Sequence, residues 1–152
     1  MLIDSYILPE CIVRPGSFGG LMVLYEANFI KLKQLAPDLQ SGSEQRISRA
    51  HNDFDLHLSL ADKTKYTCSL RLTYYFDDEI KGRVAEPDLL AKVYFDARMV
   101  EVKGWTNVRR HRALRVLDTG YGRPLDVCWS RNIMLGKWLD FLLDQGHLLA
   151  SG

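Results

Sequence analysis

The sequence predicts an α+β fold: a single domain whose antiparallel sheet of about five strands has an N-terminal and a C-terminal helix packed on it. Apolar and polar residues alternate over 54–60 and 66–76, and again over 91–95 and 99–105, which predicts two β-hairpins. Apolar residues at helical spacing precede these runs at 21–36 and follow them at 133–143. Because the helices do not alternate with the strands, we expect them to pack on one face of an antiparallel sheet.

Length and composition set the class of protein. With 152 residues, 47% of them hydrophobic and 26% charged, the chain suits one globular domain with a single core. We expect an irregular lead-in over residues 1–20, the domain over 21–148 and a short tail over 149–152. The 20 Lys and Arg residues against 19 Asp and Glu residues exclude a general nucleic-acid binder, whose affinity needs a large basic excess.

The location expected from the sequence is the reduced cytoplasm. No apolar run approaches the roughly 18–20 residues that span a bilayer. The first residues carry an acid where a secretory signal carries basic residues. Three cysteines without a CxxC spacing make neither a disulfide framework nor an obvious zinc site. The sequence implies no cofactor, and it leaves the oligomeric state open.

The first helix is expected over 21–36, because Pro37 disfavours helical geometry in the residue before it. Its wide apolar face is typical of a core helix. Asn28 is a polar member of that face, and we expect it to bond to the backbone of a neighbouring loop or strand. The opposite face should point to water, with Glu26, Lys31, Lys33 and Gln34.

The strands follow in order. A short strand is expected over 45–50, where Ile47 is the only strongly apolar residue. The strands over 54–60 and 66–76 form the first hairpin around a turn at 61–65, with Cys68 as a buried apolar side chain. Residues 77–87 are polar and predict a loop. The second hairpin has its turn at 96–98.

The last helix should start near Ser130, whose hydroxyl can accept from the free N–H groups of a first helical turn. Gly146 is placed to end it, because glycine adopts the left-handed conformation after a helix without strain from a Cβ. Between the sheet and this helix, residues 108–117 alternate poorly, and residues 119–124 predict a loop.

One row of residues has the composition of a metal site: His51, Asp53, Asp55 and His57 stand at every second position. On a strand they would share a face, and imidazole and carboxylate are ligands for zinc, manganese or iron. However, neighbours on one face lie roughly 6.6 Å apart, so four of them span too far for one ion. Residues 52–53 also have turn composition. We therefore interpret the row as the solvated face of a strand and predict no metal.

The best anion-binding candidate is a basic segment that contains Arg109, Arg110 and Arg112. Guanidinium groups suit phosphate, and alternation would send Arg110 and Arg112 to the same face of a strand. The proposed ligand-binding residues are therefore Arg110, Arg112 and Arg123, with Trp105 or Tyr121 as a stacking surface. The alternative interpretation is a charged edge strand or loop that discourages aggregation.

No catalytic motif is present: the chain has no GxSxG sequence, P-loop or cysteine signature of an active site. We therefore predict no catalytic residue and favour a non-enzymatic binding or regulatory module. Its partner would be an unidentified protein or a phosphorylated small molecule. The first alternative is binding of a phosphorylated small molecule or nucleotide through the arginine cluster. The second is an enzyme whose pocket the sequence does not reveal.

A family resemblance rests on short patches of sequence. They lie at 22–29, 32–37, 66–67, 87–89, 93–98, 101–102, 132, 137–139 and 145–147. On these patches the chain resembles the bacterial YqiB-like family, a domain of unknown function. The resemblance implies a small cytoplasmic bacterial protein with no activity to carry over. It also hints at nucleotide signalling, because family members are encoded near enzymes that hydrolyse cyclic or ADP-linked nucleotides.

Overall fold

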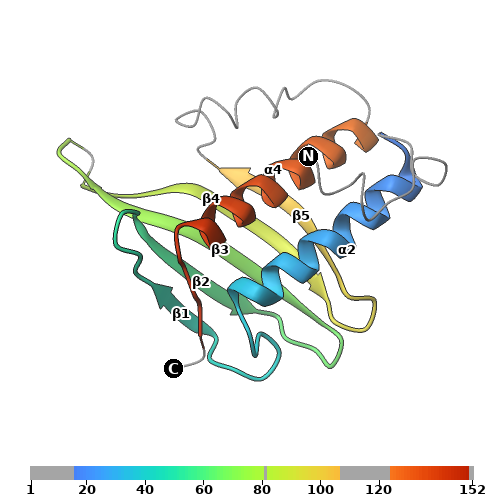
Figure 1. Ribbon diagram of the computed structural model, residues 1–152, viewed down its shortest axis with the longest axis horizontal. Helices are drawn as coiled ribbons and strands as arrows, with labels where there is room; N and C mark the ends of the chain where they lie inside the picture. Colours follow the sequence, from blue (N-terminus) through green and yellow to red (C-terminus); the bar gives the residue numbers. More distant parts are fainter. Residues whose placement is uncertain (1–15, 81, 107–123, 151–152) are drawn as a thin grey trace.

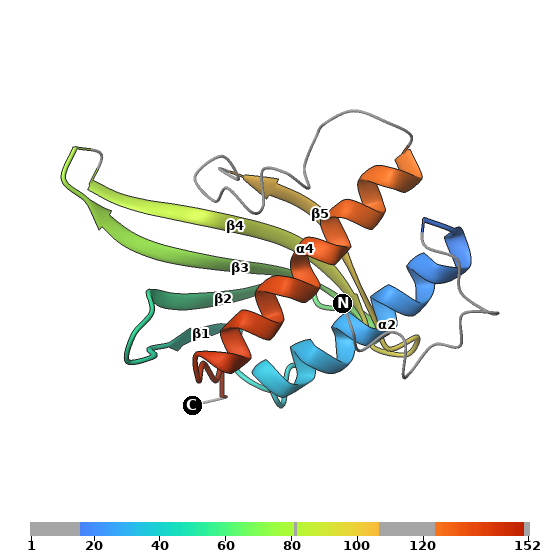
Figure 2. The same ribbon diagram turned by 45° about the horizontal axis from the view of Figure 1, so that its top comes forward.

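The computed structural model describes residues 16–80, 82–106 and 124–150. Five antiparallel strands form one sheet in the order of the chain. They are β1 (Gln45–Ser48), β2 (Asp55–Ala61), β3 (Thr67–Asp78), β4 (Gly82–Tyr94) and β5 (Met99–Thr106). Helices α2 (Phe18–Leu35) and α4 (Pro124–Asp144) lie side by side on one face of this sheet (Figures 1 and 2). The predicted α+β class is confirmed.

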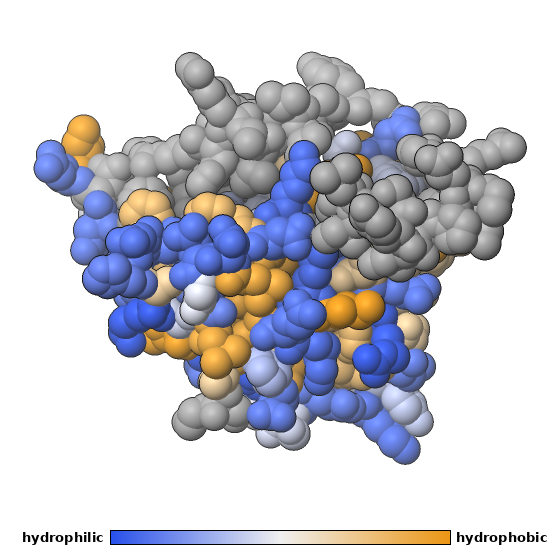
Figure 3. All heavy atoms as spheres, viewed as in Figure 1, coloured by the Kyte–Doolittle hydropathy of each residue, from blue (hydrophilic) through white to orange (hydrophobic). Residues whose placement is uncertain are grey.

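The core lies between the helices and the sheet. Alternation turns every second residue of the strands towards the helices, and those side chains are nearly all apolar. The buried set includes Leu56, Leu58, Leu60, Cys68, Leu70, Leu72, Leu89, Val93, Val100 and Val102, packed against Leu32, Leu35, Leu139 and Leu142. On the helix-bearing surface, apolar side chains emerge between hydrophilic ones (Figure 3). Neither helix is long and apolar enough to cross a membrane.

The predicted loop over 77–87 is largely wrong, because residues 77–78 belong to β3 and residues 82–87 belong to β4. The hairpin of β3 and β4 continues well beyond the other strands (Figure 2), with Asp77 opposite Arg83. The ladder continues with Ala85 opposite Tyr75 and Val84 opposite Phe76, so the strands extend beyond the point where the apolar alternation of the sequence stops. Pro87 falls at the irregularity between Thr73 and Tyr75, where a residue without an N–H group is tolerated.

The last helix begins at Pro124, six residues before the predicted Ser130 cap. Proline suits the first helical position, where its missing N–H group would have had no partner. The extra turns bring Leu125 and Trp129 against the buried cluster of Leu21, Leu24 and Tyr25 on α2. The end of the helix is as predicted: Gly146 has a φ of 86°, and the three N–H groups that follow the helix bond back to its last turn.

Lys31 does not face water as predicted, because its ammonium group lies 3.1 Å from Asp140 Oδ2 on α4. Asn28 also points at α4, where its Nδ2 donates to the carbonyl of Asn132 at 2.8 Å instead of to a loop or strand. The side chains of Lys31 and Asn28 therefore both stabilise the contact between α2 and α4. Sequence periodicity identifies the buried face but not which helix covers it.

The segment after α4 is docked against the start of the sheet. Leu149 is buried, and its N–H group donates to the carbonyl of Leu35 at 2.8 Å. The buried guanidinium of Arg46 donates to four backbone carbonyls, those of Pro37, Asp38, Ser43 and Leu149. One β1 side chain thus joins the end of α2, the loop after it and the C-terminal segment.

Candidate functional site

The sheet has a second face, on which no described helix lies, and this face carries a polar hollow of about 260 Å³. We call it the open-face hollow. Its lining residues come from four strands and are Gln45, His57, Ser59, Arg71, Thr73, Tyr75 and Arg83. Six of the seven were not among the residues that the sequence singled out; His57 was. A polar depression with convergent cationic groups is a candidate site for an anion.

Strand register explains why these side chains meet. On β2 and β3, His57 lies opposite Thr73 and Ser59 lies opposite Arg71. The intervening residues of both strands are the leucines that face the helices, so the polar partners all emerge on the other side. Tyr75 continues the row, and Arg83 reaches it from the extended part of β4. The hollow is thus a consequence of alternation and of the β3–β4 extension together.

At one end of the hollow, Arg71 forms a two-point ion pair with Asp88 on β4. The hydroxyl of Thr73 donates to the same carboxylate at 2.7 Å. The hydrogen bonds and charge of Asp88 raise the pKa of Arg71 above its ordinary value, so the guanidinium is permanently cationic. The pair uses Nε and Nη2 of Arg71. Its Nη1 end makes no hydrogen bond with another described residue and is available to a ligand.

At the other end, the guanidinium of Arg83 lies over the ring of Tyr75, 4.2 Å from its centre. The imidazole of His57 packs edge-on to the same ring at 4.5 Å. Among the described side chains, Arg83 makes no ion pair. The aromatic ring therefore holds a cation and an imidazole at one end of the hollow without neutralising the cation.

Electrostatics keep the His57 imidazole uncharged. Partial burial is the main cause that lowers its pKa, and the charges of Arg83 and Arg49 add to the effect. The charge of Asp55 raises the pKa of His57, but the Asp55 carboxylate is paired with Arg49 at 3.5 Å. A neutral imidazole can both donate and accept a hydrogen bond, and it can take up a proton when a negative charge arrives.

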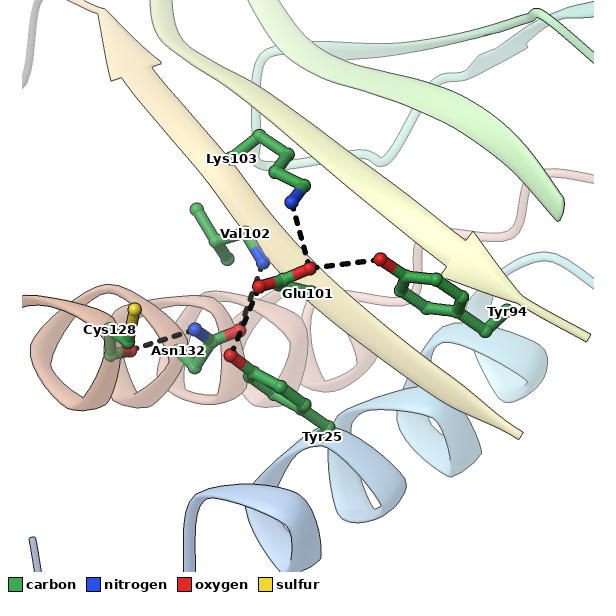
Figure 4. A network of polar contacts seen from close by, with 7 residues as sticks. All are labelled: Tyr25, Tyr94, Glu101, Val102, Lys103, Cys128 and Asn132. Atoms are coloured by element: carbon green, nitrogen blue, oxygen red, sulfur yellow. Dashed lines mark hydrogen bonds and ion pairs between the residues drawn. The ribbon is translucent and has the colours of Figure 1, made fainter. Parts of the chain in front are cut away.

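A second polar cluster surrounds Glu101 on β5 (Figure 4). Its carboxylate accepts hydrogen bonds from Tyr94 at 3.1 Å and from Tyr25 of α2 at 3.3 Å, and Lys103 lies 3.0 Å away. Burial, followed by the charge of Glu101, raises the pKa of Tyr25. Nearby, Asn132 of α4 accepts the N–H of Val102. Each polar group here satisfies another, so we interpret the cluster as the fastening of α2 and α4 to the edge strand.

The row of predicted metal candidates is dispersed. His51 lies in the turn before β2, and Asp55 is paired with Arg49. Asp53 points to the helix side, where it accepts from Tyr74 at 2.6 Å. Only His57 is in the hollow. Nowhere among the described residues do three or more His, Cys, Asp or Glu side chains gather as metal ligands.

Asp53 belongs to a buried chain of contacts that resembles a catalytic triad in composition only. Ser48 lies 2.8 Å from Nδ1 of His147, and Nε2 of His147 lies 2.8 Å from Asp53. The Ser48 oxygen also accepts the N–H of Leu148 at 2.9 Å. The imidazole has no exposed surface. Since no substrate could reach the serine, we interpret the chain as part of the docking of the C-terminal segment.

The other predicted ligand-binding residues lie elsewhere. Arg110, Arg112, Tyr121 and Arg123 fall outside the described residues. Trp105 lies on the helix-bearing side of the sheet, partly buried, with its ring centre 5.5 Å from that of Trp138. In that position it packs α4 on the sheet and does not face the open-face hollow.

A family model matches residues 31–148, and it describes a protein of unknown function, DUF1249. The chain belongs to the DUF1249 family. No curated protein and no solved structure matches the chain. All seven residues that line the hollow of this DUF1249 domain lie within the matched segment, whereas Tyr25 of the Glu101 cluster lies before it. The hollow is thus part of the segment that defines the DUF1249 family.

Proposed function

We propose that this DUF1249 protein is a non-enzymatic binding module and that its open-face hollow holds a phosphorylated small molecule. The observation that carries the proposal is the position of Arg83. Its guanidinium lies over the ring of Tyr75 and has no carboxylate partner among the described residues. Arginine presents donors in a fork that matches phosphate oxygens. The Nη1 end of Arg71 supplies a second donor on the opposite side of the hollow.

The rest of the lining favours a ligand rich in hydroxyl groups. Ser59, Thr73 and Gln45 offer hydroxyl and amide groups that can bond to sugar-like hydroxyls. The face of Tyr75 that could stack on a nucleotide base is occupied by Arg83. A sugar phosphate therefore fits the lining better than a nucleotide, whose base would have no aromatic platform there.

The lining favours binding over catalysis. Its seven side chains include no carboxylate and no thiol, and His57 is the single member of a residue type whose ordinary pKa lies near neutral pH. An acid–base mechanism with two titrating groups would need a second one within hydrogen-bond reach of the ligand.

The test is calorimetric titration of glucose 6-phosphate and adenosine 5′-monophosphate against the wild type and Arg83→Met. A charge-assisted arginine–phosphate contact is worth about 1.5–3 kcal/mol, so Arg83→Met should weaken binding of the sugar phosphate at least tenfold. Lys92→Met is the matched control, since Lys92 lies over Tyr94 on β4 and does not line the hollow. It should leave binding unchanged.

Two results would overturn the proposal. If neither glucose 6-phosphate nor adenosine 5′-monophosphate binds at millimolar concentration, the proposed function is wrong. Wild-type affinity in Arg83→Met, combined with its loss in the double variant Arg110→Ala, Arg112→Ala, would move the site to the arginine cluster that the sequence favoured.

A further inference from the structure

The charges around His57 nearly cancel in pairs, and this limits which anion the hollow can balance. The groups that face the imidazole from neighbouring elements are Arg49 after β1, Asp55 of β2, Arg71 and Tyr75 of β3, and Arg83 of β4. Arg49 is paired with Asp55, and Arg71 is paired with Asp88. Asp77 stands opposite Arg83 in the ladder but makes no ion pair with it. Among the described groups, one positive charge, that of Arg83, is left over.

Resting on the proposed function, we propose that the hollow selects phosphomonoesters in their dianionic form and that His57 takes up one proton when such a ligand binds. The proton comes from the solvent and ends on the imidazole, and no covalent bond forms or breaks. The single charge of Arg83 balances a monoanion. A dianion leaves one negative charge over, and a protonated His57 supplies the matching positive charge in a partly buried site.

The same groups explain why the proton is absent before binding. In the free protein, burial and the positive charges of Arg83 and Arg49 lower the pKa of His57, so the imidazole is neutral near pH 7. A bound dianion reverses the sign of the local potential and favours the charged form. His57 therefore acts as a sensor of ligand charge: it stays neutral beside a sulfate ester or a phosphodiester and becomes charged beside a phosphomonoester.

Linkage gives the pH dependence. If binding raises the pKa of His57, affinity rises as the pH falls from about 8 towards neutrality, because the bound state takes up protons. Below the second pKa of a phosphomonoester, about 6, the ligand itself becomes a monoanion and the advantage is lost. Affinity for a phosphomonoester should thus pass through a maximum near pH 6–7. Affinity for a sulfate ester, which carries one charge throughout, should vary far less.

The experiment compares glucose 6-phosphate with glucose 6-sulfate, two ligands of the same shape that differ in charge. Titration calorimetry at pH 7 in two buffers with different ionisation enthalpies measures the protons taken up on binding. For the wild type we expect proton uptake with the phosphate, none with the sulfate, and at least tenfold weaker binding of the sulfate. His57→Gln keeps a polar side chain and should abolish the uptake while it weakens phosphate binding about five- to tenfold.

The outcomes separate this inference from the proposed function. Equal affinity for the two esters, or proton uptake that persists in His57→Gln, would overturn the role of His57 while the hollow remains a binding site. Failure of both esters to bind at millimolar concentration would overturn the proposed function itself. The melting temperature of His57→Gln, compared with that of the wild type, shows whether a change in affinity reflects loss of folded protein.

Discussion

The contact between α2 and α4 depends on a residue without a side chain. A Cβ at Gly136 would lie 2.8 Å from Oδ1 of Asn28, closer than real Cβ contacts allow. The amide of Asn28 cannot swing away freely, because it is fully buried and its Nδ2 donates to Asn132. The substitution Gly136→Ala therefore forces either the amide or the helix to move.

Two opposing terms decide the size of the effect. Alanine in place of glycine inside a helix gains about 1 kcal/mol of helix propensity. Overpacking a filled contact costs about 1–3 kcal/mol, and displacing Asn28 from its hydrogen bond to Asn132 costs about 1 kcal/mol more. We expect Gly136→Ala to lower the free energy of unfolding by about 1–3 kcal/mol. For a domain of this size, that corresponds to a fall in melting temperature of roughly 2–12 °C.

A double-mutant cycle in urea isolates the clash. In an Asn28→Ala background the obstructing oxygen is absent, so Gly136→Ala should become neutral or stabilising by up to about 1 kcal/mol. Gly19→Ala is the matched control, because a Cβ at Gly19 meets nothing within 4 Å in the first turn of α2. If Gly136→Ala destabilises equally in both backgrounds, or raises stability on its own, the steric explanation is refuted.

Two further predictions concern Arg46 and the buried tyrosines. Arg46→Met should lower the free energy of unfolding by about 3–5 kcal/mol in a urea titration, because it removes the four hydrogen bonds that the buried guanidinium donates to backbone carbonyls. Arg49→Met, at a side chain 70% exposed, should change it by less than about 0.5 kcal/mol, and a similar loss in both variants would contradict this role of Arg46. Burial, followed by the hydrogen bond to Asp53, raises the pKa of Tyr74, so its neutral form is favoured in the folded protein. The contribution of Tyr74 to the free energy of unfolding is fully present below pH 10. Above pH 10 it should decline by about 1.4 kcal/mol per pH unit. The decline should be shallower in Tyr74→Phe but not in Tyr66→Phe, whose ring is half exposed; equal slopes in all three proteins would count against this linkage.

The fold was largely predictable because alternation and helical spacing record which face of each element is buried. The residues over 54–60 and 66–74 alternate with a period of two, and the structure pairs these two runs as the predicted hairpin. The prediction failed where burial gives no signal. Residues 82–87 pair through their backbones on a protruding ribbon, and the first turns of α4 pack through scattered residues such as Leu125 and Trp129.

The candidate site could be predicted only in part. Alternation alone puts His57 and Ser59 on one face and Arg71, Thr73 and Tyr75 on another, and these two faces coincide in the sheet. The missing information was the register, which the turn over residues 62–66 sets by pairing Ala61 with Ser69. Arg83 was beyond prediction, because its position depends on the irregularity in the β3–β4 pairing. The spacing of residues along one strand therefore indicated His57 as a metal candidate instead of as part of a cationic hollow.

Both arginines of the open-face hollow are held in place before a ligand arrives. Arg71 is fixed by two contacts with Asp88, and Arg83 is fixed by the ring of Tyr75. Immobilising a long side chain on binding costs about 0.5–1.5 kcal/mol, and here most of that loss has already occurred on folding. Beneath Arg71 the strands cannot adapt either, because the other face of β2 and β3 there is buried in the leucine core. A rigid arrangement of donors rewards a ligand whose charge matches it and gains little from one that does not. The exchange of a phosphate for a sulfate on one sugar therefore examines the hollow more directly than a substitution in the protein, because it alters the charge and leaves every protein contact in place.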